Sequence, residues 1–80
     1  MTSQPGAAEL LDAIDRFLTG ETGRIHVDRI EGLVLEHFTE ALWFDDISFA
    51  LAMYVPNAEA PYYDEAELAA ELRPVAAQLR

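Results

Sequence analysis

The feature that most constrains the fold is an apolar stretch at residues 41–56, ALWFDDISFALAMYVP, which holds the only Trp of the chain. At about 3.6 residues per helical turn, one side of it collects apolar residues, namely Trp43, Ile47, Ala50, Leu51 and Tyr54. A helix that is apolar on almost all sides is normally buried against several neighbours. Asp45 and Asp46 suit its N-terminus, and Pro56 ends it because proline has no N–H to donate. This stretch therefore predicts the central helix of a small bundle.

Two helices are expected before this stretch. Apolar residues recur at helical spacing over residues 7–18, and Gly20 follows where a helix would end in a left-handed C-cap. Thr22 can cap a second helix, whose apolar stripe includes Ile30 and Phe38. We expect this second helix to end near residue 40.

A fourth helix is expected after a loop at residues 57–63. Asp64 can cap it, and Glu67 can complete a capping box. Its apolar stripe keeps the same phase through Pro74, which predicts one helix with a kink at that proline. Because every element is helical and the connections are short, we expect an all-α fold, a small antiparallel four-helix bundle with a kinked last helix.

The size and charge of the chain restrict its partners. Its 80 residues make a single domain, with residues 1–6 expected as a loose tail. Fifteen Asp and Glu residues oppose five arginines, so the formal net charge is −10. Such a surface repels phosphate backbones and anionic lipids, so we expect neither nucleic acid nor membrane as a partner. It attracts a basic protein, although general solubility explains the charge equally well.

Two further observations concern location and chemistry. The longest apolar run, near residues 49–55, is shorter than the roughly 20 residues of a membrane span. No basic-then-apolar leader is visible, which argues against export by a signal peptide. Without cysteine, the chain can form neither a disulfide nor a thiolate metal site.

No group of residues predicts catalysis, a cofactor or a bound metal. His26 and His37 are eleven residues apart, too far to share a metal, and packing at the core edge is their ordinary explanation. Glu36 and Glu40 form one i, i+4 pair, which is a weak metal signal without a matching motif elsewhere. A solvated acidic face explains that pair better. We therefore expect no enzyme, and nothing implies a homo-oligomer.

Two groups of residues are candidate partner-binding sites. The first is Asp45 and Asp46, with Glu36 and Glu40 across the preceding break, although helix electrostatics alone explains the aspartates. In the second group, tyrosines alternate with acids, as at protein-binding surfaces. Its members are Glu59, Tyr62, Tyr63, Asp64 and Glu65. The structural alternative is that one tyrosine closes the end of the bundle and the other is incidental.

The second half of the chain combines an acidic pair, an apolar helix ending in an aromatic and x-Pro, and a tyrosine followed by acids. The residues of this pattern are Asp45, Asp46, Tyr54, Pro56, Tyr63, Asp64 and Glu65. In this pattern the chain resembles the colicin D immunity proteins and the wider colicin-like immunity family. The segment LLDAIDRFLTG at residues 10–20 is similar to the opening helix of that family. The resemblance covers most of the chain.

This resemblance implies a small acidic helical bundle that binds the nuclease domain of a cognate toxin, which in the type member cleaves tRNA. It implies that carboxylates cover the basic active-site cleft, in the cytoplasm of the producing cell. The family's inhibitory acids gather near the end of the third helix, where this chain has Ala52, Val55 and Asn57, and only Glu59 nearby. We therefore expect an immunity protein against a basic toxin, with a (t)RNase as the expected target. Either the toxin differs from that of the type member, or the binding surface has moved toward Asp45, Asp46 or residues 62–65.

The alternative is an acidic helical carrier or adaptor module. A carrier attaches its group to a serine at a helix start, usually within Asp-Ser-Leu. Ser48 follows Asp45, Asp46 and Ile47 but lies inside the predicted central helix, so the match is poor.

Overall fold

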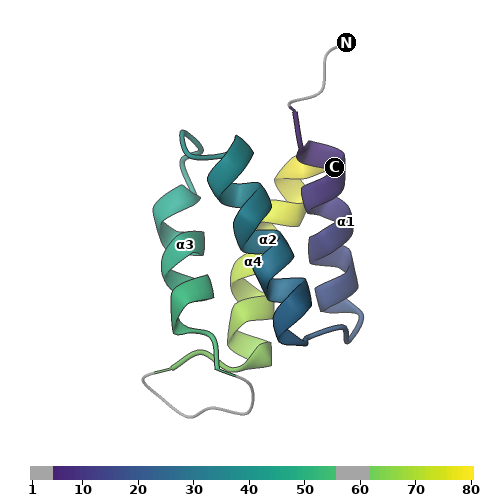
Figure 1. The fold of residues 1–80 in the computed structure, drawn as a ribbon, viewed down its shortest axis with the longest axis vertical. Coiled ribbons are helices and arrows are strands. Elements are labelled where there is room, and N and C mark those ends of the chain that lie inside the picture. Colours follow the sequence, from purple (N-terminus) through teal and green to yellow (C-terminus); the bar gives the residue numbers. More distant parts are fainter. Residues whose placement is uncertain (1–4, 56–61) are drawn as a thin grey trace.

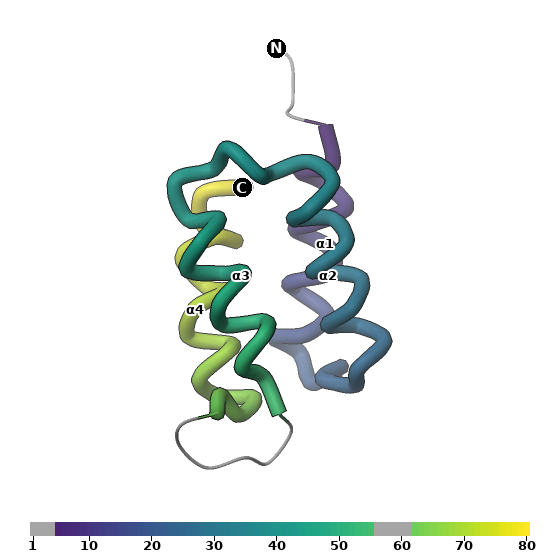
Figure 2. Tube along the Cα trace, turned by 60° about the vertical axis from the view of Figure 1, so that its left-hand side comes forward, coloured from purple at the N-terminus to yellow at the C-terminus, as the bar shows by residue number. Residues whose placement is uncertain are grey.

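The structure is a computed structural model that describes residues 5–55 and 62–80. Its four helices are α1 (Ala7–Leu18), α2 (Arg24–His37), α3 (Phe44–Met53) and α4 (Glu65–Leu79). Successive helices run in opposite directions (Figure 1). α1 and α3 each pack against both α2 and α4, so they lie on opposite sides of the bundle (Figure 2). The predicted all-α four-helix bundle is confirmed.

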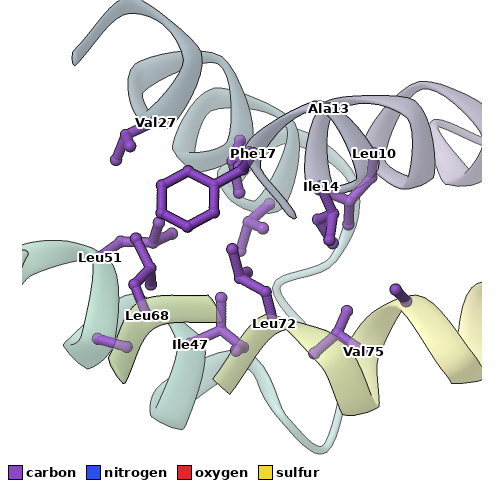
Figure 3. Close-up of a cluster of buried hydrophobic side chains, with 14 of the residues drawn as sticks. Leu10, Ala13, Ile14, Phe17, Val27, Ile47, Leu51, Leu68, Leu72 and Val75 are labelled. Atoms are coloured by element: carbon purple, nitrogen blue, oxygen red, sulfur yellow. The ribbon is translucent and has the colours of Figure 1, made fainter. Parts of the chain in front are cut away.

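One side of each helix forms the core. Phe17 of α1 lies near its centre and faces side chains of α3 and α4 (Figure 3). The largest fully buried side chains are Leu10, Ile14, Phe17, Val27, Ile30, Val34, Phe38, Ile47, Leu51, Leu68 and Leu72. Burying one such side chain contributes about 1.5–3 kcal/mol. The spacing of these residues therefore determines which side of each helix faces inward.

α1 ends in a Schellman motif at Gly20. Gly20 has a φ of +113°, which glycine adopts without steric cost. Its N–H donates to the Phe17 carbonyl at 3.1 Å, and the Glu21 N–H donates to the Arg16 carbonyl at 3.0 Å. These two bonds satisfy carbonyls that the helix leaves without partners at its end. The predicted left-handed end of this helix is confirmed.

α2 begins and ends at other residues than predicted. Its N-cap residue is Gly23, and Thr22 stays outside the helix, where its carbonyl accepts a hydrogen bond from the Tyr54 hydroxyl at 2.7 Å. The helix ends at His37 rather than near residue 40. Phe38 leaves the helical conformation and buries its ring in the core, with its centroid 5.4 Å from that of Trp43. Packing of this aromatic pair starts the turn into α3.

α3 is not the central helix that its apolar content predicted. Ile47, Ala50, Leu51 and Tyr54 are buried as expected, whereas Trp43 is half-buried. On the opposite side, Phe49 is 57% exposed. Only α2 and α4 contact this helix among the described elements, because α1 lies across the bundle. The prediction of burial against several neighbours is therefore wrong.

α4 begins as predicted, with Asp64 as its N-cap. The Asp64 Oδ1 atom accepts a hydrogen bond from the Glu67 N–H at 2.9 Å. The helix continues through Pro74 as one element, and the kink at this residue stays a prediction. Pro74 cannot donate to the Ala70 carbonyl, but both residues are exposed, so water can bond that carbonyl.

None of the helices in the described part of the chain combines the length and the apolar character that crossing a bilayer requires.

Candidate partner-binding surface

The negative charge of the chain is confined to one continuous part of the sequence. Residues 30–72, which we call the acidic segment, contain ten Asp and Glu residues and neither Arg nor Lys. The rest of the chain contains five acids and five arginines and is formally neutral. The acidic segment therefore carries the whole net charge of −10. It runs from the second half of α2 through α3 to the first half of α4 and includes no part of α1, and we call this part of the bundle the α3 side.

Ion pairs neutralise Asp12 and Asp15 of α1, Glu21 after it and Asp28 of α2. Arg16 lies 3.0 Å from Asp12 and 3.7 Å from Glu21, measured from guanidinium nitrogen to carboxylate oxygen. The hydrogen bond and charge of Asp12 raise the pKa of the Arg16 guanidinium. In the same way Arg24 pairs with Asp28 at 3.3 Å. These pairs are solvent-exposed, so each adds little stability, but together they leave this side with little free charge.

Another ion pair joins the C-terminal residue to α1. The Arg80 Nη2 atom lies 2.9 Å from Asp15 Oδ1, so the last residue of the chain is paired with α1. Four of the five arginines, Arg16, Arg24, Arg29 and Arg80, lie within 4.0 Å of a carboxylate outside the acidic segment. These four arginines therefore neutralise carboxylates in the formally neutral part of the chain, outside the acidic segment.

The first predicted group, Asp45 and Asp46, lies in the first turn of α3 and is exposed. The positive end of the helix dipole favours both carboxylates there. Both also point into water at one end of the α3 side, where a partner can reach them. The structural and the functional explanation of these residues are therefore compatible.

The second predicted group lies at the other end of α3. The Tyr63 N–H donates to the Met53 carbonyl at 2.8 Å, and the Val55 N–H donates to the Tyr63 carbonyl at 2.9 Å. This short bridge holds Tyr62, exposed, and Tyr63, half-buried, beside the C-terminal end of α3. Asp64 and Glu65 follow at the start of α4. Glu59, which was also predicted as a site residue, lies outside the described residues.

Phe49 connects the two groups, and sequence analysis did not select it. It lies one helical turn after Asp45 and Asp46, and its ring packs edge-on against that of Tyr63 with centroids 6.1 Å apart. Its position opposite the inner side of α3 was visible in the sequence. Because the sequence predicted a fully buried helix, the outward direction of Phe49 did not predict that its side chain is exposed. We use the name α3 surface for Asp45, Asp46, Phe49, Val55, Tyr62, Tyr63, Asp64 and Glu65.

Exposed apolar side chains are concentrated in the same segment as the charge. Among the described residues, six large apolar side chains are exposed, and five of them belong to the acidic segment. These five are Leu35, Leu42, Phe49, Val55 and Tyr62. The exception is Ile25 in α2. Two thirds of the Asp and Glu residues and most of the exposed large apolar side chains of the described residues therefore belong to the same segment.

A shallow hollow of about 300 Å³ lies at the junction of α2 and its following turn. Its lining consists of Glu36, His37, Thr39, Glu40 and Ala41, without Asp45 or Asp46. Of the first predicted group, Glu36 and Glu40 therefore line this hollow, whereas Asp45 and Asp46 lie in the first turn of α3. In the described part of the chain no three His, Asp or Glu residues are arranged to hold a metal ion.

The remaining polar candidates are only partly accessible. His26 and His37 are both half-buried at the edge of the core, and the His37 ring lies edge-on to Phe38 with centroids 6.4 Å apart. Ser48 is also partly buried, in the second turn of α3 rather than at its start. This position does not suit the attachment serine of a carrier domain.

No protein-family model, no curated protein and no solved structure matches this chain.

Proposed function

We propose that this protein is an immunity-type inhibitor, which binds and neutralises a basic bacterial toxin domain without being an enzyme. The observation that carries the proposal is the coincidence of the net charge with exposed apolar side chains on the α3 side of the bundle. An acidic protein-binding surface of this kind suits a partner whose own binding site is basic. The resemblance to colicin-type immunity proteins supports the same function.

A ribonuclease is the toxin that fits this surface best. The active site of an RNA-cleaving enzyme has to attract phosphates, so it is lined by cationic side chains. Carboxylates on a rigid helix can occupy the positions of those phosphates and exclude the substrate. Asp45 and Asp46 are held in this way by α3, and Asp64 is held by its hydrogen bond to the Glu67 N–H. In this proposal the inhibitor acts in the cytoplasm of the cell that makes the toxin.

The test uses the protein encoded beside this one as the partner, because an immunity protein is expected to be encoded next to its toxin. We expect one-to-one binding by calorimetry that weakens as salt concentration rises, since salt screens exposed charges. We also expect loss of the partner's RNase activity at equimolar inhibitor. Absence of binding, or binding that leaves nuclease activity and toxicity unchanged, would contradict the proposal and favour an acidic adaptor module.

A matched pair of variants separates the role of α3 from that of net charge. Asp45→Asn with Asp46→Asn removes two charges from the α3 surface, whereas Glu9→Gln with Asp28→Asn removes two exposed charges outside the acidic segment. We expect the first pair to slow association by about tenfold at low salt and the second pair to have little effect. Equal effects would show that net charge alone, rather than this surface, attracts the partner.

A further inference from the structure

We propose that Phe49, together with Val55 and Tyr62, is the apolar anchor of the α3 surface. The partner that binds the α3 surface is a basic protein, which presents an apolar side chain between its cationic groups. The inference rests on the proposed function and goes beyond it, because it assigns the lifetime of the complex to apolar contact and its rate of formation to the acids.

The position of Phe49 supports this role. Phe49 is 57% exposed, yet its ring is in T-shaped contact with the Tyr63 ring at a centroid distance of 6.1 Å. An aromatic side chain that is already held in place loses little conformational freedom when a partner covers it. Phe49 is therefore prepared to contribute its remaining exposed area to an interface.

The bridge between the two chain segments adds two more apolar side chains. Tyr54 and Tyr63 are the bridged residues, and Tyr54 points into the core. Because side chains alternate along an extended segment, Val55 and Tyr62 point away from the core on either side of the bridge. Both are exposed, and both are chain neighbours of the bridged pair that contains Tyr63, the ring partner of Phe49.

Acids lie at both ends of this apolar area. Asp45 and Asp46 precede Phe49 by one helical turn, and Asp64 and Glu65 follow the bridge. With a rise of 1.5 Å per residue, the seven steps from Asp46 to Met53 at the end of α3 span roughly 10 Å. An apolar centre with a charged rim on this scale is the arrangement found in protein interfaces, where central aromatic residues contribute most of the binding energy.

Charge complementarity selects the occupant. In a symmetric dimer through this surface, two acidic segments would meet, each with a net charge of −10. An anionic membrane would be repelled for the same reason. A basic protein surface, in contrast, places cations against both acidic ends while an apolar side chain covers Phe49.

The test uses two synthetic helical peptides with equal lysine content as probes. One peptide carries leucines on one face, and the other carries serines at the same positions. We expect the leucine peptide to bind the isotopically labelled full-length protein about tenfold more tightly, with NMR shift changes centred on residues 45–55 and 62–65. In Phe49→Ser this preference should disappear, while the salt dependence of binding remains.

The control is Ile25→Ser, because Ile25 is 77% exposed but lies outside the acidic segment. The Ile25→Ser variant should retain the preference for the leucine peptide. Tyr62→Ala serves as a second test, since its exposed ring can be removed without disturbing the Phe49–Tyr63 contact, and it should weaken the preference. Circular dichroism melts establish that each variant is folded.

Equal affinity for the two peptides, or equal losses in Phe49→Ser and Ile25→Ser, would overturn the anchor. Concentration-dependent shift changes at Phe49 without peptide would instead identify a second copy as the occupant and would also overturn it. Peptide binding tests the anchor, whereas inhibition of the partner's RNase activity tests the proposed function, so failure of one is distinguishable from failure of the other. A protein that inhibits the toxin equally well with Phe49→Ser would retain its function and lose this anchor.

Discussion

Tyr54 is the residue at which core packing and hydrogen bonding coincide. Its ring lies edge-on to Phe17 with centroids 5.8 Å apart, and its hydroxyl donates to the Thr22 carbonyl at 2.7 Å. It therefore joins the end of α3 to the connection between α1 and α2. The sequence predicted that Tyr54 would be buried but not that its hydroxyl would have this partner.

Tyr54→Phe is expected to reduce the free energy of unfolding by about 1 kcal/mol, because the ring remains and only the hydrogen bond is lost. Burial raises the pKa of the Tyr54 hydroxyl, and the nearby Glu65 carboxylate raises it further. Above about pH 10 the unfolded chain thus loses this proton more readily than the folded chain, so stability falls as pH rises. Urea unfolding from pH 8 to pH 11 should show a shallower decline in Tyr54→Phe. The same decline as in the wild type would contradict this prediction, and Tyr62→Phe is the control.

Gly6 is a second residue with a specific requirement. It is the N-cap of α1 with a φ of +82°, and an added Cβ would overlap the His37 imidazole. We expect Gly6→Ala to destabilise the protein by about 1–2 kcal/mol in urea unfolding, since both backbone strain and the overlap oppose it. Gly32→Ala is the matched comparison, because a Cβ there meets no atom within 4 Å. It should stabilise α2 by about 0.5–1 kcal/mol, and equal effects at both glycines would refute this explanation.

At the scale of elements, Asp64 has two roles that substitutions can separate. Asp64→Ala removes the acceptor for the Glu67 N–H and should cost about 1 kcal/mol of stability. Asp64→Asn keeps an acceptor oxygen and should retain most of that stability while losing the charge. If capping and binding are separate roles, thermal unfolding will distinguish Ala from wild type, and partner association will distinguish Asn from wild type. Equal melting temperatures for Ala and Asn would show that the cap is unimportant.

The helices that sequence predicted best are those whose ends depend on local interactions. Gly20 ends α1 and Asp64 begins α4 through hydrogen bonds to residues at most five positions away. The start of α2 depends instead on a distant residue, because the Tyr54 hydroxyl donates to the Thr22 carbonyl, and its end depends on how Phe38 packs in the core against Trp43. The Tyr54 hydroxyl has no signature in the sequence around Thr22, and the burial of Phe38 depends on the packing of the whole core, which explains the errors at these two ends.

The candidate site also combines features that local sequence predicts with features that depend on how the helices pack. Acids and tyrosines are recognisable by residue type, and the described ones lie at the two ends of α3, where binding of a partner stays a prediction. Phe49 was missed, because whether an apolar residue is buried depends on how many helices surround its own. The separation of charge along the sequence was available as a signal and would have identified the acidic segment directly.

For the whole molecule, the segregated charge predicts an unusual response to salt. Glu36→Gln with Glu40→Gln removes two carboxylates that line one hollow. At pH 8 and low salt we expect the melting temperature to rise by about 2 °C, because repulsion between like charges decreases. The gain should vanish at high salt, where repulsion is screened.

The control for this prediction is Asp12→Asn with Asp15→Asn, which changes the net charge equally but removes ion-paired acids. This variant should show no rise in melting temperature. A rise of similar size in both variants would mean that total charge, rather than its location, limits stability.

The position of α3 also has a consequence for local unfolding. This helix is the shortest of the four and rests on only α2 and α4 among the described elements, so it is the element expected to open most readily. A partner that binds its outer side therefore closes those openings, and part of its binding free energy appears as slower amide exchange at residues 47–53. Hydrogen exchange of this one helix would then report occupancy of the surface, even for a partner whose identity is unknown.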